Sequence, residues 1–176
     1  MGVGVSSYPI ARQAQKADGC SIIPLPADFE SWEELLALIL GSFRYMDGVI
    51  DPPSSARWLT PENLEQKAAA ETAFLALLDG RIVGCVFLAE KDDHFYLGKL
   101  AVDPACQGRG IGRRLVAAAE EHVRGTAKPL IELQVRVELV DNQATFARLG
   151  FQETGRTAHA GYDRPTSITM RKDLRP

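Results

Sequence analysis

Residues 100–114, LAVDPACQGRGIGRR, combine glycines and arginines at the predicted start of a helix. Backbone N–H groups in the first turn of a helix have no partner within the helix, and glycines let a ligand approach them closely. That end of a helix also favours negative charge. Three arginines follow with no acidic residue between them: Arg109, Arg113 and Arg114. The pattern favours a pyrophosphate site over its alternative, a tight turn with a solvated basic surface.

Two common phosphate motifs do not fit this segment. In the dinucleotide fingerprint the third glycine lies three residues after the second, whereas here Gly112 follows Gly110 by only two. A mononucleotide P-loop needs Gly-Lys-Ser/Thr, which the segment lacks.

The segment instead resembles the acetyl-coenzyme A motif of the GNAT family of N-acetyltransferases, Gln/Arg-x-x-Gly-x-Gly/Ala. Here the motif reads Gln107-Gly108-Arg109-Gly110-Ile111-Gly112, after a predicted strand that ends Leu-Ala-Val. Farther along, Asn142 and the pair Gly150-Phe151 resemble the family's Asn-containing helix and the Gly-Phe turn after it. The resemblance covers about residues 20–172.

The predicted strands and helices that position this segment follow one another in the order β-α-α-β-β-β-α-β-α-β-β. Asp79-Gly80 between two apolar runs predicts a hairpin, and the strand–helix–strand unit 95–135 predicts a parallel crossover. The expected strands are 20–25, 72–78, 81–89, 95–102, 130–137, 151–155 and 167–170. The expected helices are 29–40, with Asp28 as N-cap and Gly41 as its end, 61–70, capped by Thr60, 110–124 and 142–149.

These elements indicate a mixed α+β fold. The resemblance implies the GNAT fold: a central, mostly antiparallel twisted sheet of about seven strands, flanked by helices and splayed between the fourth and fifth strands. We expect one N-acetyltransferase domain over residues 19–176 and a disordered tail over residues 1–18.

Composition narrows the class of protein. The 176 residues carry 20 basic and 23 acidic side chains, a net charge of −3, which argues against nucleic-acid binding. No apolar run approaches the roughly 18 residues of a membrane span. Three cysteines are too few and too irregularly spaced for a disulfide framework or a metal site, and the first residues lack the apolar core of a signal peptide. We therefore expect a cytoplasmic protein with no metal.

The resemblance implies how acetyl-CoA binds as cosubstrate. The pantetheine arm would lie between the two splayed strands, with the Leu100 N–H on the thioester carbonyl oxygen and the backbone of Ala101 and Val102 on the pantetheine amides. The pyrophosphate would lie on the N–H groups of residues 107–112. The expected cosubstrate-binding residues are Leu100, Ala101, Val102, Gln107, Gly108, Arg109, Gly110, Ile111, Gly112, Arg113, Asn142 and Phe146.

The expected reaction is direct attack of a neutral amine on the thioester. Many family members protonate the leaving thiolate with a tyrosine four residues before the glycine of the Gly-Phe turn, but this chain has Phe146 there. The thiolate then leaves unassisted, or another group acts. Strand alternation predicts that Tyr96, Gly98, Leu100 and Val102 share one face, which makes Tyr96 the candidate base or relay. The alternative for Tyr96 is a half-buried packing residue.

Acceptor recognition is expected in the connection between the first two helices and in the last loop. Asp47 and Asp51 are natural partners for a cationic amine, and His159 and Tyr162 lie in the loop before the last strand. Each could equally be an ordinary loop residue. Glu132, Arg136 and Glu138, at or just beyond the fifth strand, could also face the cleft.

The sequence thus predicts transfer of an acetyl group from acetyl-CoA to a primary amine, on a small molecule or a peptide, by a monomer or homodimer that binds neither nucleic acid nor membrane. Two alternatives stay open. One is a catalytically weak acyl-CoA-binding sensor or regulatory module, because Phe146 lacks the acidic hydroxyl that many family members have at this position. The other is a nucleic-acid-binding α+β domain.

Overall fold

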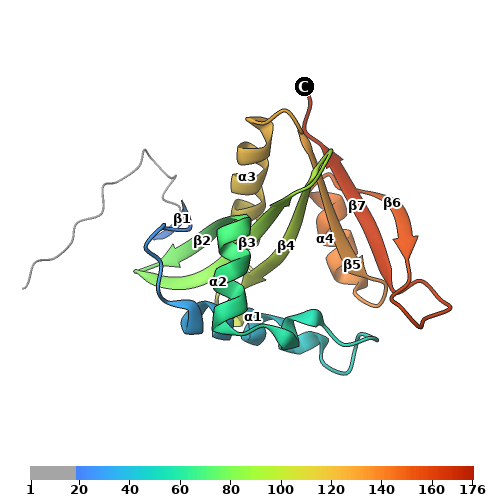
Figure 1. The fold of residues 1–176 in the computed structure, drawn as a ribbon, viewed down its shortest axis with the longest axis horizontal. Helices are drawn as coiled ribbons and strands as arrows, with labels where there is room; N and C mark the ends of the chain where they lie inside the picture. Colours follow the sequence, from blue (N-terminus) through green and yellow to red (C-terminus); the bar gives the residue numbers. More distant parts are fainter. Residues whose placement is uncertain (1–18) are drawn as a thin grey trace, which may run out of the picture.

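A computed structural model describes residues 19–176, and the tail expected over residues 1–18 lies outside the described residues. All seven strands belong to one sheet, in the order β1-β2-β3-β4-β5-β7-β6 (Figure 1). The strands are β1 Cys20–Pro24, β2 Thr72–Leu78, β3 Arg81–Glu90, β4 Phe95–Val102, β5 Leu130–Arg136, β6 Gln152–Thr157 and β7 Ser167–Asp173. The α-helices are α1 Trp32–Phe43, α2 Pro61–Ala70, α3 Ile111–Arg124 and α4 Val140–Arg148.

The sheet is antiparallel except where β4 meets β5. These two strands pair only through Phe95 with Ile131 and Tyr96 with Glu132. Beyond those pairs the strands separate, and Figure 1 shows the sheet dividing there into two parts. The expected mixed fold, the parallel crossover and the splay between the fourth and fifth strands are confirmed.

Helices cover the two faces of the sheet unequally. α1 and α2 pack on one face of β2 and β3 through a cluster that includes Leu35, Ile39 and Leu64. α3 packs on the opposite face through Leu115 and Ala119, and the core there continues past β5 and β7 to α4. None of the helices within residues 19–176 covers the face of β5, β7 and β6 on the α1 and α2 side (Figure 1). No helix within residues 19–176 is long and apolar enough to cross a bilayer.

Two expectations about the first helix are wrong. Its N-cap is Ser31 rather than Asp28, because Asp28 lies in the turn that leaves β1. Gly41 does not end the helix, since α1 continues to Phe43 and its residue Ser42 is buried. Tertiary packing here outweighs the helix-breaking tendency of glycine. The cap at Thr60 is confirmed, with a reciprocal capping box to Asn63.

The C-terminal elements differ from their expected bounds. α4 begins at Val140, two residues early, and β6 and β7 run to Thr157 and Asp173. β7 is long because it pairs along all of β5 on one side and with β6 on the other. Backbone pairing extends β7 through Arg171, Lys172 and Asp173, whose polar side chains give no apolar pattern in the sequence.

The predicted alternation along β4 is also wrong. The pairing with β3 shifts between Cys85 and Phe87, and Lys99 adopts φ +50°, so β4 contains a β-bulge. Phe95 and Leu97 before the bulge, and Leu100 and Val102 after it, all pack in the core on the α3 side. Tyr96 and Gly98 therefore lie on the α1 and α2 side, opposite Leu100 and Val102.

Candidate active site

A cavity of about 900 Å³ lies where the larger part of the sheet meets α4. Most of the residues expected to bind the cosubstrate line it: Leu100, Val102, Gln107, Gly108, Gly110, Ile111, Gly112, Asn142 and Phe146. Arg109 and Arg113 are exposed and do not line it, and Ala101 is buried on the opposite face of β4. The structure therefore brings the glycine loop before α3 and three residues of α4, Asn142, Thr145 and Phe146, to one cavity.

The loop before α3 offers open backbone to a ligand. Gly108 and Gly110 both adopt φ +75°, and a Cβ at either position would contact nothing within 4 Å. Gly110 is the N-cap of α3, a 14-residue helix with no acidic residue in its first turn. Arg114 turns away from the loop and donates to the Cys20 carbonyl oxygen at 3.1 Å. The loop thus joins unobstructed N–H groups to the positive end of a helix.

Ser42 has a structural role that no sequence pattern predicts. Its hydroxyl oxygen accepts a hydrogen bond from the Val102 N–H at 3.2 Å, so α1 fixes the end of β4. One of the two backbone groups expected to hold pantetheine is therefore already engaged.

A second cavity, of about 250 Å³, lies between the diverging strands β4 and β5. Tyr96, Gly98 and Lys99 line it from β4, Gln134 and Arg136 from β5, and Lys67 from α2. It shares five lining residues with the larger cavity: Phe43, Tyr45, Leu100, Asn142 and Phe146. The two cavities therefore meet between the middle of β4 and α4.

The junction of the cavities carries a hydroxyl group. Asn142 Nδ2 donates to the Tyr45 hydroxyl oxygen at 2.8 Å, which leaves the Tyr45 proton free to donate elsewhere. Phe146 lies one helical turn after Asn142 and packs edge-to-face on Phe151 at 5.8 Å between ring centroids. Tyr45 was expected only as part of the acceptor loop after the first helix, because no local pattern links it to α4, 97 residues away.

Charges around the smaller cavity shift several pKa values. Burial, and then the negative charge of Glu132, raise the pKa of Tyr96, while the backbone of Gln134 opposes the rise. Burial and the charge of Lys67 lower the pKa of Lys99. Burial raises the pKa of Cys85 to about 12, and its thiol donates to the Lys99 carbonyl oxygen at 3.3 Å. Cys85 therefore supports the bulge as a neutral thiol.

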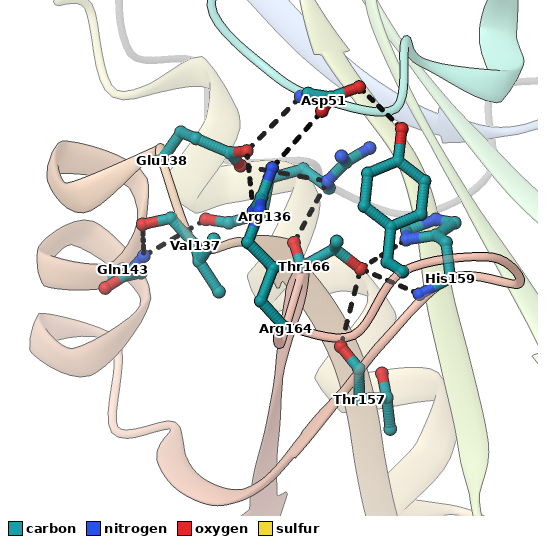
Figure 2. Close-up of polar contacts among 10 residues, drawn as sticks. Asp51, Arg136, Val137, Glu138, Gln143, Thr157, His159, Arg164 and Thr166 are labelled. Atoms are coloured by element: carbon teal, nitrogen blue, oxygen red, sulfur yellow. Dashed lines mark hydrogen bonds and ion pairs between the residues drawn. The ribbon is translucent and has the colours of Figure 1, made fainter.

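The residues expected to bind the acceptor contact one another across three loops. Tyr162 donates to Asp51 Oδ1 at 2.6 Å, Arg164 lies 3.3 Å from Asp51 Oδ2, and Glu138 Oε1 accepts from the Asp51 N–H at 3.2 Å. Figure 2 shows Asp51 above Glu138 and Arg136 within this network. The connection after α1 is thereby tied to the connection after β5 and to the loop between β6 and β7.

The other expected acceptor residues lie apart from the smaller cavity. His159 is held to the buried Thr166, with its Nδ1 2.5 Å from Thr166 Oγ1 (Figure 2). Asp47 lines a separate cavity of about 280 Å³ near Arg57. Glu132 pairs with Arg171 at 2.6 Å and lines a cavity of about 540 Å³ that adjoins the smaller one, since Tyr96 and Gln134 line both.

Comparison with known proteins identifies the family. The model of the acetyltransferase (GNAT) family matches residues 32–151, more than half of the chain. The chain belongs to the GNAT family. A mycothiol acetyltransferase of Gordonia bronchialis is 35% identical over 114 residues, which cover 62% of this chain and 33% of that protein. The N-alpha-acetyltransferase RimI of Mycobacterium tuberculosis is 37% identical over 75 residues, which cover 42% of this chain and 46% of that protein.

The GNAT chain described here thus spans less than half the length of these two curated relatives. Among solved structures, the PaiA N-acetyltransferase of Thermoplasma acidophilum in complex with coenzyme A superposes with a TM-score of 0.73 at 18% identity. That match covers 87% of this chain and 99% of the other. At this identity the match supports the GNAT fold alone.

Proposed function

We propose that this protein transfers an acetyl group from acetyl-CoA to a primary amine by direct attack within a ternary complex. One observation carries the proposal: the glycine-loop cavity and the cavity between β4 and β5 share a wall. A thioester at that wall is reachable from the coenzyme side and from the acceptor side. Family membership and a coenzyme complex among the structural neighbours support acetyl-CoA as the donor.

The larger cavity suits the coenzyme. Its pyrophosphate binds the N–H groups of residues 107–112, where Gly108 and Gly110 leave room, and the exposed Arg109 and Arg113 add positive charge nearby. The Leu100 N–H, just after the bulge, hydrogen-bonds the thioester oxygen and the oxyanion that develops from it. Asn142 and Phe146 form the opposite wall.

The acceptor amine approaches through the smaller cavity. Its nitrogen forms a bond to the thioester carbon, the carbon–sulfur bond breaks, the amide forms and coenzyme A leaves as thiolate or thiol. The proton that the nitrogen loses passes through the Tyr96 hydroxyl towards Glu132 and solvent. Because its pKa is raised, Tyr96 stays protonated near neutral pH and acts as a relay rather than as an ionised base.

Tyr45 is the general acid that protonates the leaving thiolate, since Phe146 has no hydroxyl to do so. Its hydroxyl accepts from Asn142, keeps its own proton and lines both cavities. A proton donated from Tyr45 to the departing sulfur neutralises the thiolate, and the exposed Tyr45 side chain regains a proton from solvent. The hydroxyl comes from the segment after α1 instead of from α4.

The acceptor is a small molecule or a peptide end, because the smaller cavity holds only about 250 Å³. Three buried, unpaired cysteines suit the reducing conditions of the cytoplasm, the compartment we propose. We keep the proposals of a single domain over residues 19–176 and of a monomer or homodimer.

The test is release of free coenzyme A from acetyl-CoA across a panel of primary amines. We expect turnover with at least one amine and initial-velocity lines that intersect, as a ternary complex requires. Parallel lines would indicate a covalent acetyl-enzyme and contradict direct attack. Acetyl-CoA binding by calorimetry without turnover of any amine would favour the alternative, a sensor or regulatory module.

A further inference from the structure

The charge of the smaller cavity is opposite to the one expected for a simple cationic amine. Among the described residues that line it, three are cations, Lys67, Lys99 and Arg136, and none is an aspartate or glutamate. Asp51, the expected anionic partner, is bound by Tyr162 and Arg164, and Asp47 lines a different cavity. An acceptor that carried only positive charge would meet repulsion on this wall.

Lys99 is held in this wall by the β-bulge. Its backbone adopts φ +50°, a conformation rare for a residue with a Cβ, and its carbonyl is fixed by the Cys85 thiol. The side chain is only partly exposed. Within residues 19–176 its ammonium forms no hydrogen bond or ion pair. Partial burial of an unpaired ammonium is costly, so a ligand anion beside it would be stabilising.

Arg136 supplies a second free donor. Its side chain is 13% exposed, and its Nε donates to the Thr166 carbonyl oxygen at 3.1 Å. Its Nη2 is buried and has no hydrogen-bond partner among the described residues. Glu138 Oε2 is equally unpartnered, and it lies 4.0 Å from Arg136 Nε, too far for a hydrogen bond. The guanidinium therefore retains an N–H group that suits a planar oxyanion.

Lys67 contributes less. Its ammonium pairs with Glu71 at 2.6 Å and lies over the Phe87 ring at 5.6 Å. Its charge is thus largely compensated within the protein. Among the described residues of the cavity, the cationic donors without a hydrogen-bond partner are the Lys99 ammonium and Arg136 Nη2, and the Arg136 guanidinium also forms a 4.0 Å ion pair with Glu138.

We propose that the acceptor amine carries an oxyanion, a carboxylate or a phosphate, which Lys99 and Arg136 bind in the cavity between β4 and β5. This inference rests on the proposed acetyl transfer and names its acceptor class. The same cations disfavour the ammonium form of the bound amine, so they favour the neutral nucleophile that attack on the thioester requires. The anion of the acceptor balances their charge.

The experiment compares amines in pairs that differ only in the anion. β-Alanine is paired with β-alaninamide, glycine with glycinamide, and phosphoethanolamine with ethanolamine, each with saturating acetyl-CoA. For wild type we expect kcat/KM to be at least roughly 10-fold higher for the anionic member of one pair, since one charge-assisted contact contributes about that factor. The pair with the larger ratio tells carboxylate from phosphate.

Variants then locate the effect. Lys99→Met keeps most of the length of the unbranched side chain and removes its charge. It should lower the ratio of kcat/KM for the anionic member to kcat/KM for the neutral member roughly 10-fold or more, and leave acetyl-CoA affinity unchanged. Lys91→Met, which removes an exposed charge outside the cavity, should change neither member. Lys99→Gln replaces Lys99→Met if thermal unfolding shows the methionine variant to be misfolded.

Failure of the subsite and failure of acetyl transfer give different results. If wild type releases coenzyme A but prefers the neutral members, or if Lys99→Met slows both members equally, the anion subsite is wrong and acetyl transfer stands. If no amine is turned over, the same pairs are titrated calorimetrically into protein saturated with coenzyme A. Selective binding of the anionic members, lost in Lys99→Met, supports the subsite; absent or unselective binding overturns it.

Discussion

The two cavities are built in different ways. Half of the residues that line the larger cavity come from one continuous stretch, the end of β4 with the glycine loop and the start of α3, and the rest come from residues 41–45 and from α4. The smaller cavity draws Lys67, Lys99 and Arg136 from α2, β4 and β5, beside a polar network that joins Asp51 to Tyr162, 111 residues away. The proposed phosphate loop is thus local in the chain, whereas the proposed acceptor site depends entirely on tertiary contacts. Variants should therefore affect the two sites separately.

The largest expected effect is on the donor site alone. Gly110→Asp introduces a side chain at φ +75° and a negative charge at the N-terminus of α3, where phosphate would lie. We expect acetyl-CoA affinity to fall more than roughly 100-fold, or about 2.7 kcal/mol, by calorimetry. Gly110→Asn is the control, because asparagine has the same shape and tolerates this conformation without the charge. Equal affinities for the two variants would contradict a phosphate site at this loop.

Tyr96→Phe should separate chemistry from binding. We expect kcat to fall about 100-fold with acetyl-CoA affinity nearly unchanged, because only the relay hydroxyl is lost. The pKa of Tyr96 is raised, so its hydroxyl stays protonated from pH 6 to 9, a range of roughly neutral to mildly alkaline pH below the usual tyrosine pKa of about 10. The rise of kcat/KM with pH should therefore keep its midpoint in the variant. A shifted midpoint would mean that Tyr96 is the titrating base, and an unaltered kcat would make it a packing residue.

Tyr45→Phe tests the wall that the two cavities share. Loss of the hydroxyl should lower kcat about 10-fold if thiolate departure limits the rate. Phe146→Tyr should then restore kcat in the Tyr45→Phe background, because it returns a hydroxyl to the same junction from α4. Restoration should occur without a change in acetyl-CoA affinity. If Tyr45→Phe lowers kcat and Phe146→Tyr does not restore it, the hydroxyl is not acting as an acid at the sulfur.

The smallest effect is expected at the network around the acceptor site. Asp51→Asn weakens the contacts to Tyr162 and Arg164, which are exposed and contribute little individually. We expect KM for the acceptor to rise about fivefold, with acetyl-CoA affinity unchanged. The reverse pattern, weaker acetyl-CoA binding with an unchanged acceptor KM, would mean that Asp51 supports the donor site instead.

The sequence predicts the glycine loop better than the smaller cavity, because the residues of the loop are contiguous in the chain and those of the cavity are not. Gly108, Gly110 and the strand before them form a contiguous pattern, so the fold family, the sheet, the crossover and the glycine loop were predictable. The shared wall was not, because Tyr45 meets Asn142 only through the fold. Nor was the charge of the acceptor site, since Lys99 looks like any polar residue of a strand.

One missed feature did leave a signal. Apolar residues of β4 fall at positions 95 and 97 and then at 100 and 102, so the alternation changes phase across Lys99. A phase change of one residue is the mark of a bulge. Reading it would have put Tyr96 and Leu100 on opposite faces. At Gly41 the sequence signal was misleading. Glycine tends to end a helix, but the packing of Ser42 and Phe43 outweighs that tendency.

The most direct test of the account is a crystal structure of the protein with coenzyme A and the best amine from the acceptor panel. We predict the pyrophosphate on the N–H groups of residues 107–112, and the sulfur within about 4 Å of the Tyr45 hydroxyl and close to the Leu100 N–H. The acceptor should lie between β4 and β5. A sulfur outside the wall shared by the two cavities, or an acceptor bound elsewhere, would contradict the account.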